Sequence, residues 1–157
     1  STAPVIASHA AAQGVTTHAR GKSDEELIAI ANTGGVIGIV VVPHFVHFDG
    51  DNATMEHVLN HIDYIANLVG VDHVGIGTDW PMSMPMWAQE IIKTKLAPMV
   101  GFRKEDALPT TETVEGMSDY RQFINFARGL VSRGYSDENI KKILGGNWLR
   151  VFENVCG

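Results

Sequence analysis

The stretch His73-Val74-Gly75-Ile76-Gly77-Thr78-Asp79, residues 73–79, decides the fold class, because a short apolar run with glycines ends there on an acidic side chain. Such a run is typical of a strand buried on both faces of a parallel sheet. A helix-type repeat with spacings of three and four precedes it and is closed by Gly70. The repeat consists of Met55, Val58, Leu59, Ile62, Ala66 and Val69.

The same alternation extends toward the N-terminus. Residues 36–42 form a β-branched run that Pro43 stops, as in a central parallel strand. Before it, Ser23 stands three residues ahead of Glu26 in the order of a capping box, which predicts a helix ending at the glycines 34–35. Residues 4–8 predict a first strand, buried on both faces and ending at His9. Strands that alternate with helices predict a parallel sheet with right-handed crossovers.

The C-terminal part is less regular. Residues 80–116 lack clear periodicity and contain four prolines, although residues 86–96 fit a helix. Ser118 is in position to cap a helix through about Arg133. Another short helix follows over residues 136–144, and an amphipathic tail comes after the break at residues 145–147.

Composition is that of one soluble domain, residues 1–157, with 45% hydrophobic and 19% charged residues. The formal charge of −6 argues against nucleic acid or an anionic membrane as partner. No stretch is long and apolar enough for a membrane span and no signal peptide is evident, which favours a cytoplasmic protein. Cys156 is the one cysteine, so no internal disulfide forms. The chain starts at Ser1 with an apolar run beginning at Pro4, which predicts a start in mid-fold.

Three residues at or after the expected strands carry candidate chemistry, because loops at the carboxyl ends of parallel strands converge. His9 is either a metal ligand or a structural histidine. Asp79 either binds metal, orients water or moves a proton, or else caps the next turn. Arg20 either clamps a substrate carboxylate or is solvated.

The remaining histidines give little indication of a site. His44 and His47 flank Phe45, and a His-x-x-His pair on a loop does not by itself indicate metal. His18 lies close to Arg20 in the loop, and three more are expected at the surface or at helix edges: His57, His61 and His73.

Several of these segments together resemble the renal or membrane dipeptidase family of binuclear zinc peptidases. The resembling segments, in order, are Pro4 to His9, Arg20 eleven positions later, Asp24 to Leu27, His61-Ile62-Asp63, Val69 to Asp79, and Gly145 to Val151. The resemblance covers nearly the whole chain apart from the long loop.

The resemblance implies a (β/α)8 barrel that hydrolyses dipeptides with two zinc ions. By position, His9 would be a ligand of one zinc, contributed by the sixth barrel strand. Arg20 would hold the C-terminal carboxylate of the substrate, and Asp79 would accept or return a proton at the scissile nitrogen. Such a zinc pair would polarise the peptide carbonyl and supply hydroxide near neutral pH.

The resemblance also shows what this chain lacks. A (β/α)8 barrel has eight strands and typically ~250 residues, whereas three strand–helix units are legible here. The remaining zinc ligands of the family belong to the first half of the barrel. We therefore expect a partial (β/α)8 barrel of α/β class, three parallel βα units plus C-terminal helices, inactive alone. Asp79 is followed by Trp80-Pro81-Met82 instead of the Phe-Asp-Gly common in the family, which leaves the substrate open.

Two alternatives remain. The chain is a non-catalytic structural half that pairs with itself or with a separate N-terminal half, because an incomplete barrel leaves apolar edges. In the second alternative, the parent enzyme keeps the barrel and the metal but cleaves another small amide. A small peptide is the expected substrate under the leading hypothesis.

Overall fold

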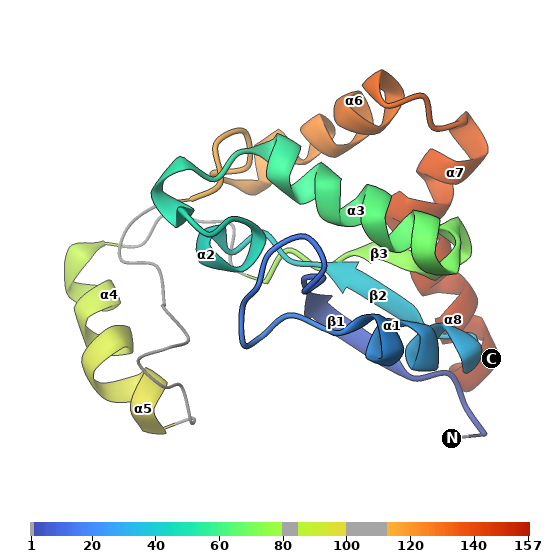
Figure 1. Ribbon diagram of the computed structural model, residues 1–157, viewed down its shortest axis with the longest axis horizontal. Helices are drawn as coiled ribbons and strands as arrows, with labels where there is room; N and C mark the ends of the chain where they lie inside the picture. The colour runs from blue at the N-terminus through green and yellow to red at the C-terminus, as the bar shows by residue number, and fades with distance from the viewer. Residues whose placement is uncertain (1, 80–84, 100–112) are drawn as a thin grey trace.

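The computed structural model describes residues 2–79, 85–99 and 113–157. Its sheet confirms the expected parallel arrangement, with strand order β1-β2-β3 (Figure 1). The strands are β1 (Ile6–Ala10), β2 (Val36–Ile39) and β3 (Val74–Ile76). All three carboxyl ends therefore lie at one edge of the sheet, which we call the carboxyl edge.

Helices occupy most of the rest of the described chain. The α-helices are α1 (Asp24–Asn32), α2 (Pro43–Val46), α3 (Met55–Val69), α4 (Met86–Ile91), α5 (Ala97–Met99), α6 (Ile124–Ser132), α7 (Asp137–Lys141) and α8 (Asn147–Cys156). Shorter 3-10 and π segments are η1 (Gly50–Asn52), η2 (Val71–His73), η3 (Ile92–Leu96), η5 (Tyr120–Phe123) and η6 (Lys142–Gly146). Within the described ranges, no helix has the length and apolar character needed to cross a bilayer.

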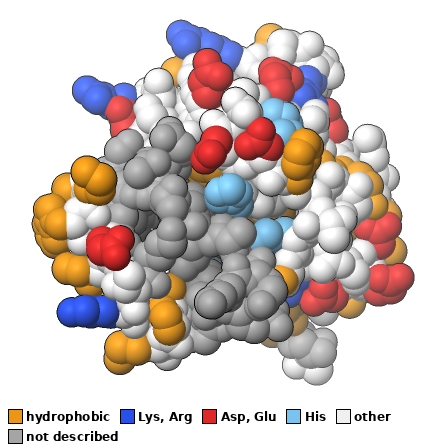
Figure 2. All heavy atoms as spheres, turned by 60° about the vertical axis from the view of Figure 1, so that its left-hand side comes forward, with side chains coloured by type: hydrophobic (Ala, Val, Ile, Leu, Met, Phe, Trp, Pro, Cys, Tyr) orange, Lys and Arg blue, Asp and Glu red, His pale blue; other side chains and the backbone are white. Residues whose placement is uncertain are grey.

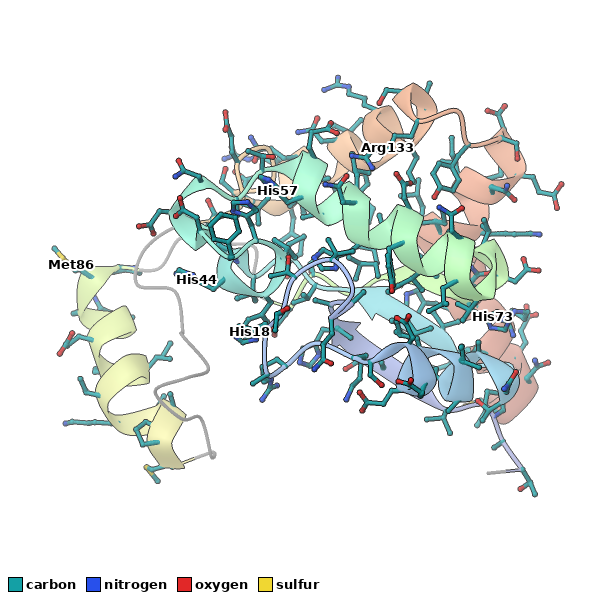
Figure 3. All side chains as sticks on the ribbon, in the orientation of Figure 1. His18, His44, His57, His73, Met86 and Arg133 are labelled. Carbon is teal, nitrogen blue, oxygen red and sulfur yellow. The ribbon has the colours of Figure 1, made fainter. Side chains whose placement is uncertain are left out.

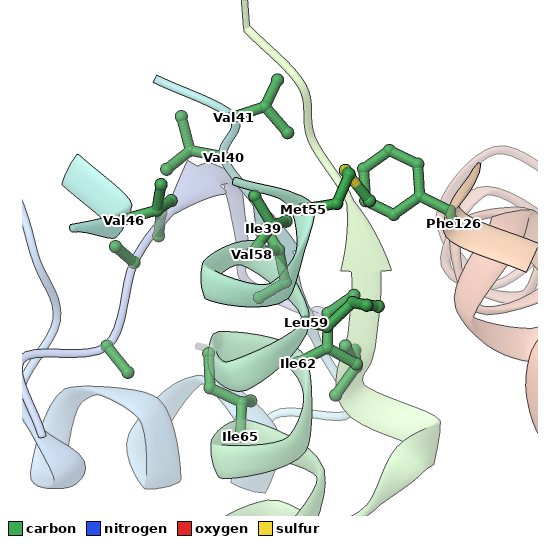
Figure 4. Packing of buried hydrophobic residues seen from close by; sticks show 14 of the residues in the cluster. Ile39, Val40, Val41, Val46, Met55, Val58, Leu59, Ile62, Ile65 and Phe126 are labelled. Carbon is green, nitrogen blue, oxygen red and sulfur yellow. The ribbon is translucent and has the colours of Figure 1, made fainter. Parts of the chain in front are cut away.

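The core lies between the sheet and α3, the helix that the three-and-four repeat predicts. Figure 4 shows this packing from close by. Val58, Ile62 and Ile65 of α3 have no exposed surface, and they belong to the same buried cluster as Ile37 and Ile39 of β2. Burying one such side chain contributes roughly 1.5–3 kcal/mol. The α3 stripe therefore closes one face of the sheet, which we call the helix face.

Glycines line the opposite face of the sheet and let other groups approach closely. A Cβ atom at Gly75 would meet the Trp148 ring, and one at Gly77 would meet the Ser8 carbonyl. The Trp148 Nε1–H donates to the Ile76 carbonyl at 3.1 Å. This second face, which we call the open face, is thus covered in part by α8.

The first strand differs from its prediction. We expected residues 4–8, buried on both faces and followed by His9, but β1 is Ile6–Ala10 and includes His9. Ala10 is buried against the helix-face core, whereas Ile6, Ser8 and His9 are exposed. A register shift between Ala7 and Ala10 adds one residue to β1, in the manner of a β-bulge. The doubly buried prediction was wrong because no described strand or helix covers that side of β1.

The other two strands are shorter than predicted. β2 ends at Ile39, three residues before the expected end, and Pro43 opens α2 as its first residue. Proline is favoured at that helical position because its missing N–H needs no partner there. β3 ends at Ile76, so Asp79 lies three residues beyond the strand.

Most helix predictions are confirmed. Ser23 and Glu26 form the capping box at α1, and Gly70 closes α3 with φ 95°. Residues 86–96 are helical, as α4 and η3. One cap was wrong: Asp119, not Ser118, accepts from the Arg121 N–H at the start of η5. Residues 80–82, where the sequence differs from the Phe-Asp-Gly common in the family, lie outside the described residues.

The segment Gly145 to Val151 fastens the edge of the sheet opposite to the carboxyl edge. Asn147, which is 2% exposed, donates through Nδ2 to the Val71 and Val74 carbonyls, each at 2.7 Å. Arg150 donates to the Gly34 and Asp72 carbonyls, each at 2.8 Å. The start of α8 therefore holds the turns that lead into β2 and β3.

Candidate functional site

The candidate residues His9 and Asp79 both lie at the carboxyl edge of the sheet. His9 is the fourth residue of β1, and Asp79 follows β3. Both side chains are exposed. Figure 2 views the molecule from the side of this edge and shows histidine and acidic side chains on its surface.

His9 has one ring nitrogen engaged. Its Nδ1 lies 2.8 Å from the Ser8 hydroxyl oxygen, a hydrogen bond between neighbours on the exposed side of β1. The bulge is what leaves both Ser8 and His9 exposed instead of alternating between the two faces. A histidine bonded through Nδ1 keeps Nε2 as the nitrogen that could meet an ion.

Arg20 is exposed and lies on the loop between β1 and α1. The ends of this loop are paired, because the Gln13 N–H donates to the Lys22 carbonyl at 2.9 Å and the Lys22 N–H to the Ala11 carbonyl at 2.7 Å. Within it, the Arg20 N–H donates to His18 Nδ1 at 3.1 Å. The loop is therefore closed at its base, and Arg20 lies on its exposed part.

Asp79 has an unusual backbone conformation. Its φ is 59°, the left-handed region, and it is the one described residue other than glycine with a positive φ. Asp and Asn adopt this region more readily than most residues, yet it remains sparsely populated and clusters at functional positions. The conformation is consistent with either reading of Asp79, a catalytic carboxylate or a turn residue.

More histidines lie around α2, as Figure 3 shows for His18, His44 and His57, whereas His73 lies at the other end of the sheet. The rings of His47 and His57 stack with centroids 3.9 Å apart. His47 Nδ1 is 2.8 Å from the Asp49 carbonyl, and His57 Nδ1 accepts from the Thr54 N–H at 3.0 Å. Burial and the neighbouring His47 lower the pKa of His57.

Where the structure describes side chains, these histidines are not part of a larger cluster of metal-ligand type. Across residues 2–79, 85–99 and 113–157, no three His, Cys, Asp or Glu side chains gather in a way that could hold an ion. His44 packs its ring against Gly50, where a Cβ would overlap it.

His61 lies behind the carboxyl edge, in a position that the sequence analysis mispredicted. We expected it at the surface, but its side chain is fully buried on α3. Its Nδ1 accepts from the Ala12 N–H at 3.0 Å, and its Nε2 lies 3.1 Å from the Val46 carbonyl. Burial lowers the pKa of His61 to about 4. The spacing Val58, His61, Ile65 on one helix face is the signal that could have located it.

A hollow lies between α3 and the α6–α7 turn, away from the carboxyl edge. It has a volume of about 370 Å³ and is lined in part by Asp63, Arg133, Tyr135 and Asn139. Asp63 there forms an ion pair with Arg133 and accepts from the Tyr135 hydroxyl at 2.8 Å. Because these groups satisfy one another, we assign the hollow a structural role in fastening α6 to α3.

The fold and the edge residues define an α/β protein whose candidate chemistry lies at the carboxyl ends of parallel strands, as in α/β enzymes. The family described as "Membrane dipeptidase (Peptidase family M19)" matches residues 1–100 and 100–156. The chain therefore belongs to the membrane dipeptidase family, peptidase family M19, a family of metallopeptidases.

Individual relatives agree with this assignment. The chain is 30% identical over 155 residues to dipeptidase tcpJ of Claviceps purpurea, covering 99% of this chain and 30% of tcpJ. It is 33% identical over 156 residues to dipeptidase ataJ of Aspergillus terreus, covering 99% of this chain and 32% of ataJ. The chain thus spans about a third of the length of these curated relatives.

Solved structures show the same fold. An amidohydrolase from Pseudomonas aeruginosa superposes with a TM-score of 0.80 at 30% identity, over 99% of this chain and 46% of that one. A metallopeptidase from Rhodobacter sphaeroides, liganded with a phosphinate mimic of the dipeptide L-Ala-D-Ala, superposes with a TM-score of 0.72 at 23% identity. The superposition covers 97% of this chain and 36% of the Rhodobacter sphaeroides chain. At 23% identity, this likeness supports the fold alone.

Proposed function

We propose that this chain is the C-terminal portion of a zinc-dependent dipeptidase barrel, folded as one domain and inactive alone. The observation that carries the proposal is the family match over residues 1–156, with His9, Arg20 and Asp79 on exposed segments that follow or end parallel strands. Each of the three residues has a separate role in the proposed site.

His9 is the proposed metal ligand. Its exposure and the bond from Nδ1 to Ser8 fit a ligand whose second nitrogen is oriented by a hydroxyl partner. A zinc ion takes about three or four protein ligands, and the described residues contain no group of that size. The described donors fit part of a metal site, and by the family resemblance the other ligands would come from the first half of the barrel. When bound, the metal would polarise the peptide carbonyl.

Arg20 is the proposed anchor for the substrate's free C-terminus. A guanidinium pairs with a carboxylate through two parallel N–H···O bonds, which fixes the position of the substrate as well as adding affinity. A longer peptide would present an amide at this point and leave the guanidinium without its charged partner. Arg20 would thereby restrict the enzyme to very short peptides.

Asp79 is the proposed proton carrier. A carboxylate next to the scissile nitrogen can take a proton from the attacking water and return it to the leaving amine, which keeps the proton balance within one side chain. The left-handed backbone of Asp79 is consistent with a residue held in place for function.

A non-catalytic role as a pairing half is the second candidate, and an apolar stripe on α8 favours it. Leu149, Phe152 and Val155 are 65%, 66% and 54% exposed. Val5 and Ile6, at the start of β1, are 40% and 47% exposed. Apolar surface of this kind is typical of a face that another chain or segment covers.

A chimera tests the proposed activity. The region of dipeptidase ataJ that matches this chain would be replaced by the present 157 residues, and hydrolysis would be assayed with zinc against a panel of dipeptides and cyclic amides. We expect the chimera to cleave dipeptides and the isolated chain to show no turnover. A folded, zinc-loaded chimera that cleaves only cyclic amides, or neither class, would contradict the dipeptidase proposal.

A further inference from the structure

One buried imidazole links three segments behind the carboxyl edge. His61 projects from α3 and has no exposed surface. It contacts the Ala12 N–H on the loop after β1 and the Val46 carbonyl at the end of α2, at 3.0 and 3.1 Å. Those two contacts join the segments that follow the first and second strands of the sheet.

The two contacts fix the protonation state of the ring. A backbone N–H only donates, so Nδ1 must carry no proton in order to accept from Ala12. A carbonyl oxygen only accepts, so Nε2 must carry the proton that it donates to Val46. His61 is therefore neutral and in the Nε2–H tautomer, in agreement with the lowering of its pKa to about 4 by burial.

A second side chain, that of Thr16, also binds the Val46 carbonyl. The Thr16 hydroxyl, on the loop that carries Arg20, also donates to the Val46 carbonyl, at 3.0 Å. Thr16 is 7% exposed. The loop is thus attached to α2 twice, directly by Thr16 and through His61 by Ala12.

Replacing His61 by an apolar residue would leave polar groups without partners. The Ala12 N–H would lose its acceptor and the Val46 carbonyl one of its donors, both in a buried setting where the loss of a partner is unfavourable. A leucine would fit the apolar stripe of α3 but could make neither bond. A histidine at this position is therefore explained by its hydrogen bonds to Ala12 and Val46 and not by the packing of α3.

We propose that His61 is a positioning residue, which holds the loop between His9 and Arg20 against α2 and so sets where Arg20 lies relative to His9. Ala12, its point of attachment, is three residues after His9 and eight before Arg20. The consequence for the substrate rests on the proposed function, whereas the attachment of the loop does not.

Two substitutions in the full chain separate the two bonds. In His61→Asn the side-chain oxygen stands near the former Nδ1 and can accept from Ala12. In His61→Gln the amide nitrogen stands near the former Nε2 and can donate to Val46. In His61→Gln, we expect the amide hydrogen-exchange rates of Ala12 and its loop to rise at least about tenfold more than those of β2. In His61→Asn, we expect the Ala12 and loop amides to stay protected.

Leu130→Ala supplies the control, because Leu130 is fully buried on α6 and contributes to stability without either bond. Its destabilisation should raise exchange evenly across the fold. If His61→Gln follows the same even pattern, His61 only fills the core and the proposal is overturned. Nitrogen NMR of the unsubstituted chain measures the tautomer of the His61 ring, and it tests the proposal even if a variant fails to fold. A proton on Nδ1 would also overturn the proposal.

The ataJ chimera adds a functional readout. We expect His61→Gln to raise KM for dipeptides about tenfold with kcat changed less than about twofold, and His61→Asn to restore KM, because the substrate meets Arg20 on binding. Equal kinetics for both variants would contradict the positioning role in catalysis. An inactive chimera would instead count against the proposed function, since the exchange and NMR results do not depend on activity.

Discussion

The two faces of the sheet differ in how completely they are covered. On the helix face, Ile37 and Ile39 lie fully buried against the stripe of α3. On the open face, Ile6 is 47% exposed, and Ser8 and His9 of the same strand are exposed too. The comparison teaches that, among the described residues, the helix face holds the core that stabilises the fold, whereas the open face keeps apolar surface of β1 exposed beside the proposed site.

The largest expected difference comes from the same substitution on each face. Ile62→Ala, on the helix face, should lower the free energy of unfolding by about 2–5 kcal/mol, because it leaves a cavity beneath α3. Ile6→Ala should change it by about 0.5 kcal/mol or less, since nearly half of that side chain is already in water. Urea unfolding of the full chain measures both. Equal losses would show that the open face is covered in solution.

Protonation of His61 at low pH should lower the stability of the fold. Its folded pKa of about 4 is below the value of 6.5 for an unperturbed histidine, so the unfolded state binds the proton more readily. Stability is therefore fully present above pH 6.5 and falls as the pH drops toward 4, by about 3 kcal/mol at most. Burial and His47 also lower the pKa of His57, which adds a loss in the same direction.

Thermal unfolding between pH 4 and 7 measures this effect. In His61→Gln the slope of stability against pH should become shallower, and adding His57→Gln to that variant should make it shallower again. An unchanged slope in His61→Gln would show that His61 is not the buried histidine that resists protonation.

A smaller effect is expected at the edge opposite to the proposed site. Asn147→Ala removes a buried hydrogen bond to Val74 and a part-buried one to Val71, and should destabilise the chain by about 1–3 kcal/mol. Asn125→Ala is the matched control, because Asn125 donates to one backbone carbonyl, that of Gly116 at 2.8 Å, accepts from the exposed Arg128, and is itself only part-buried. Chemical unfolding should show the greater loss for Asn147. Equal losses would contradict the role assigned to the start of α8.

The smallest effect should follow metal removal from the isolated chain. His9 is the one proposed ligand and the described residues hold no cluster of three, so a chelator should leave the melting temperature unchanged within error. A fall of several degrees on chelation, reversed by zinc, would mean that the chain builds a metal site of its own. Differential scanning calorimetry with and without chelator distinguishes the two results.

Much of the fold could be predicted because local patterns specify it. The apolar spacing of α3 and the Ser23–Glu26 capping box predict their helices without tertiary information, and both are present. The carboxyl end of β2 could not be predicted in the same way, because Val40 and Val41 are as apolar and buried as the strand and still donate to the Ala10 and Thr78 carbonyls, yet lie past its last residue. Strand ends depend on the neighbouring strand, which composition does not record.

The exposure of β1 and the burial of His61 were mispredicted for opposite reasons. An apolar strand signals a buried environment whether or not its partner is in the same chain, so Ile6 looked like core. A histidine within a helix suggests the surface, yet His61 lies in the apolar stripe and is satisfied by two backbone groups that no local pattern reveals. The joint role of His9, Arg20 and Asp79 remains a prediction from the resemblance.

The most direct test of the account is the kinetics of three variants in the ataJ chimera: His9→Ala, Arg20→Gln and Asp79→Asn. The account predicts loss of bound zinc and of activity for the first and a raised KM for the second. For the third it predicts a fall in kcat of about 10²–10⁴, the usual contribution of a general acid or base. Unchanged zinc content, KM and kcat in all three variants would contradict the claim that this chain supplies part of a dipeptidase site.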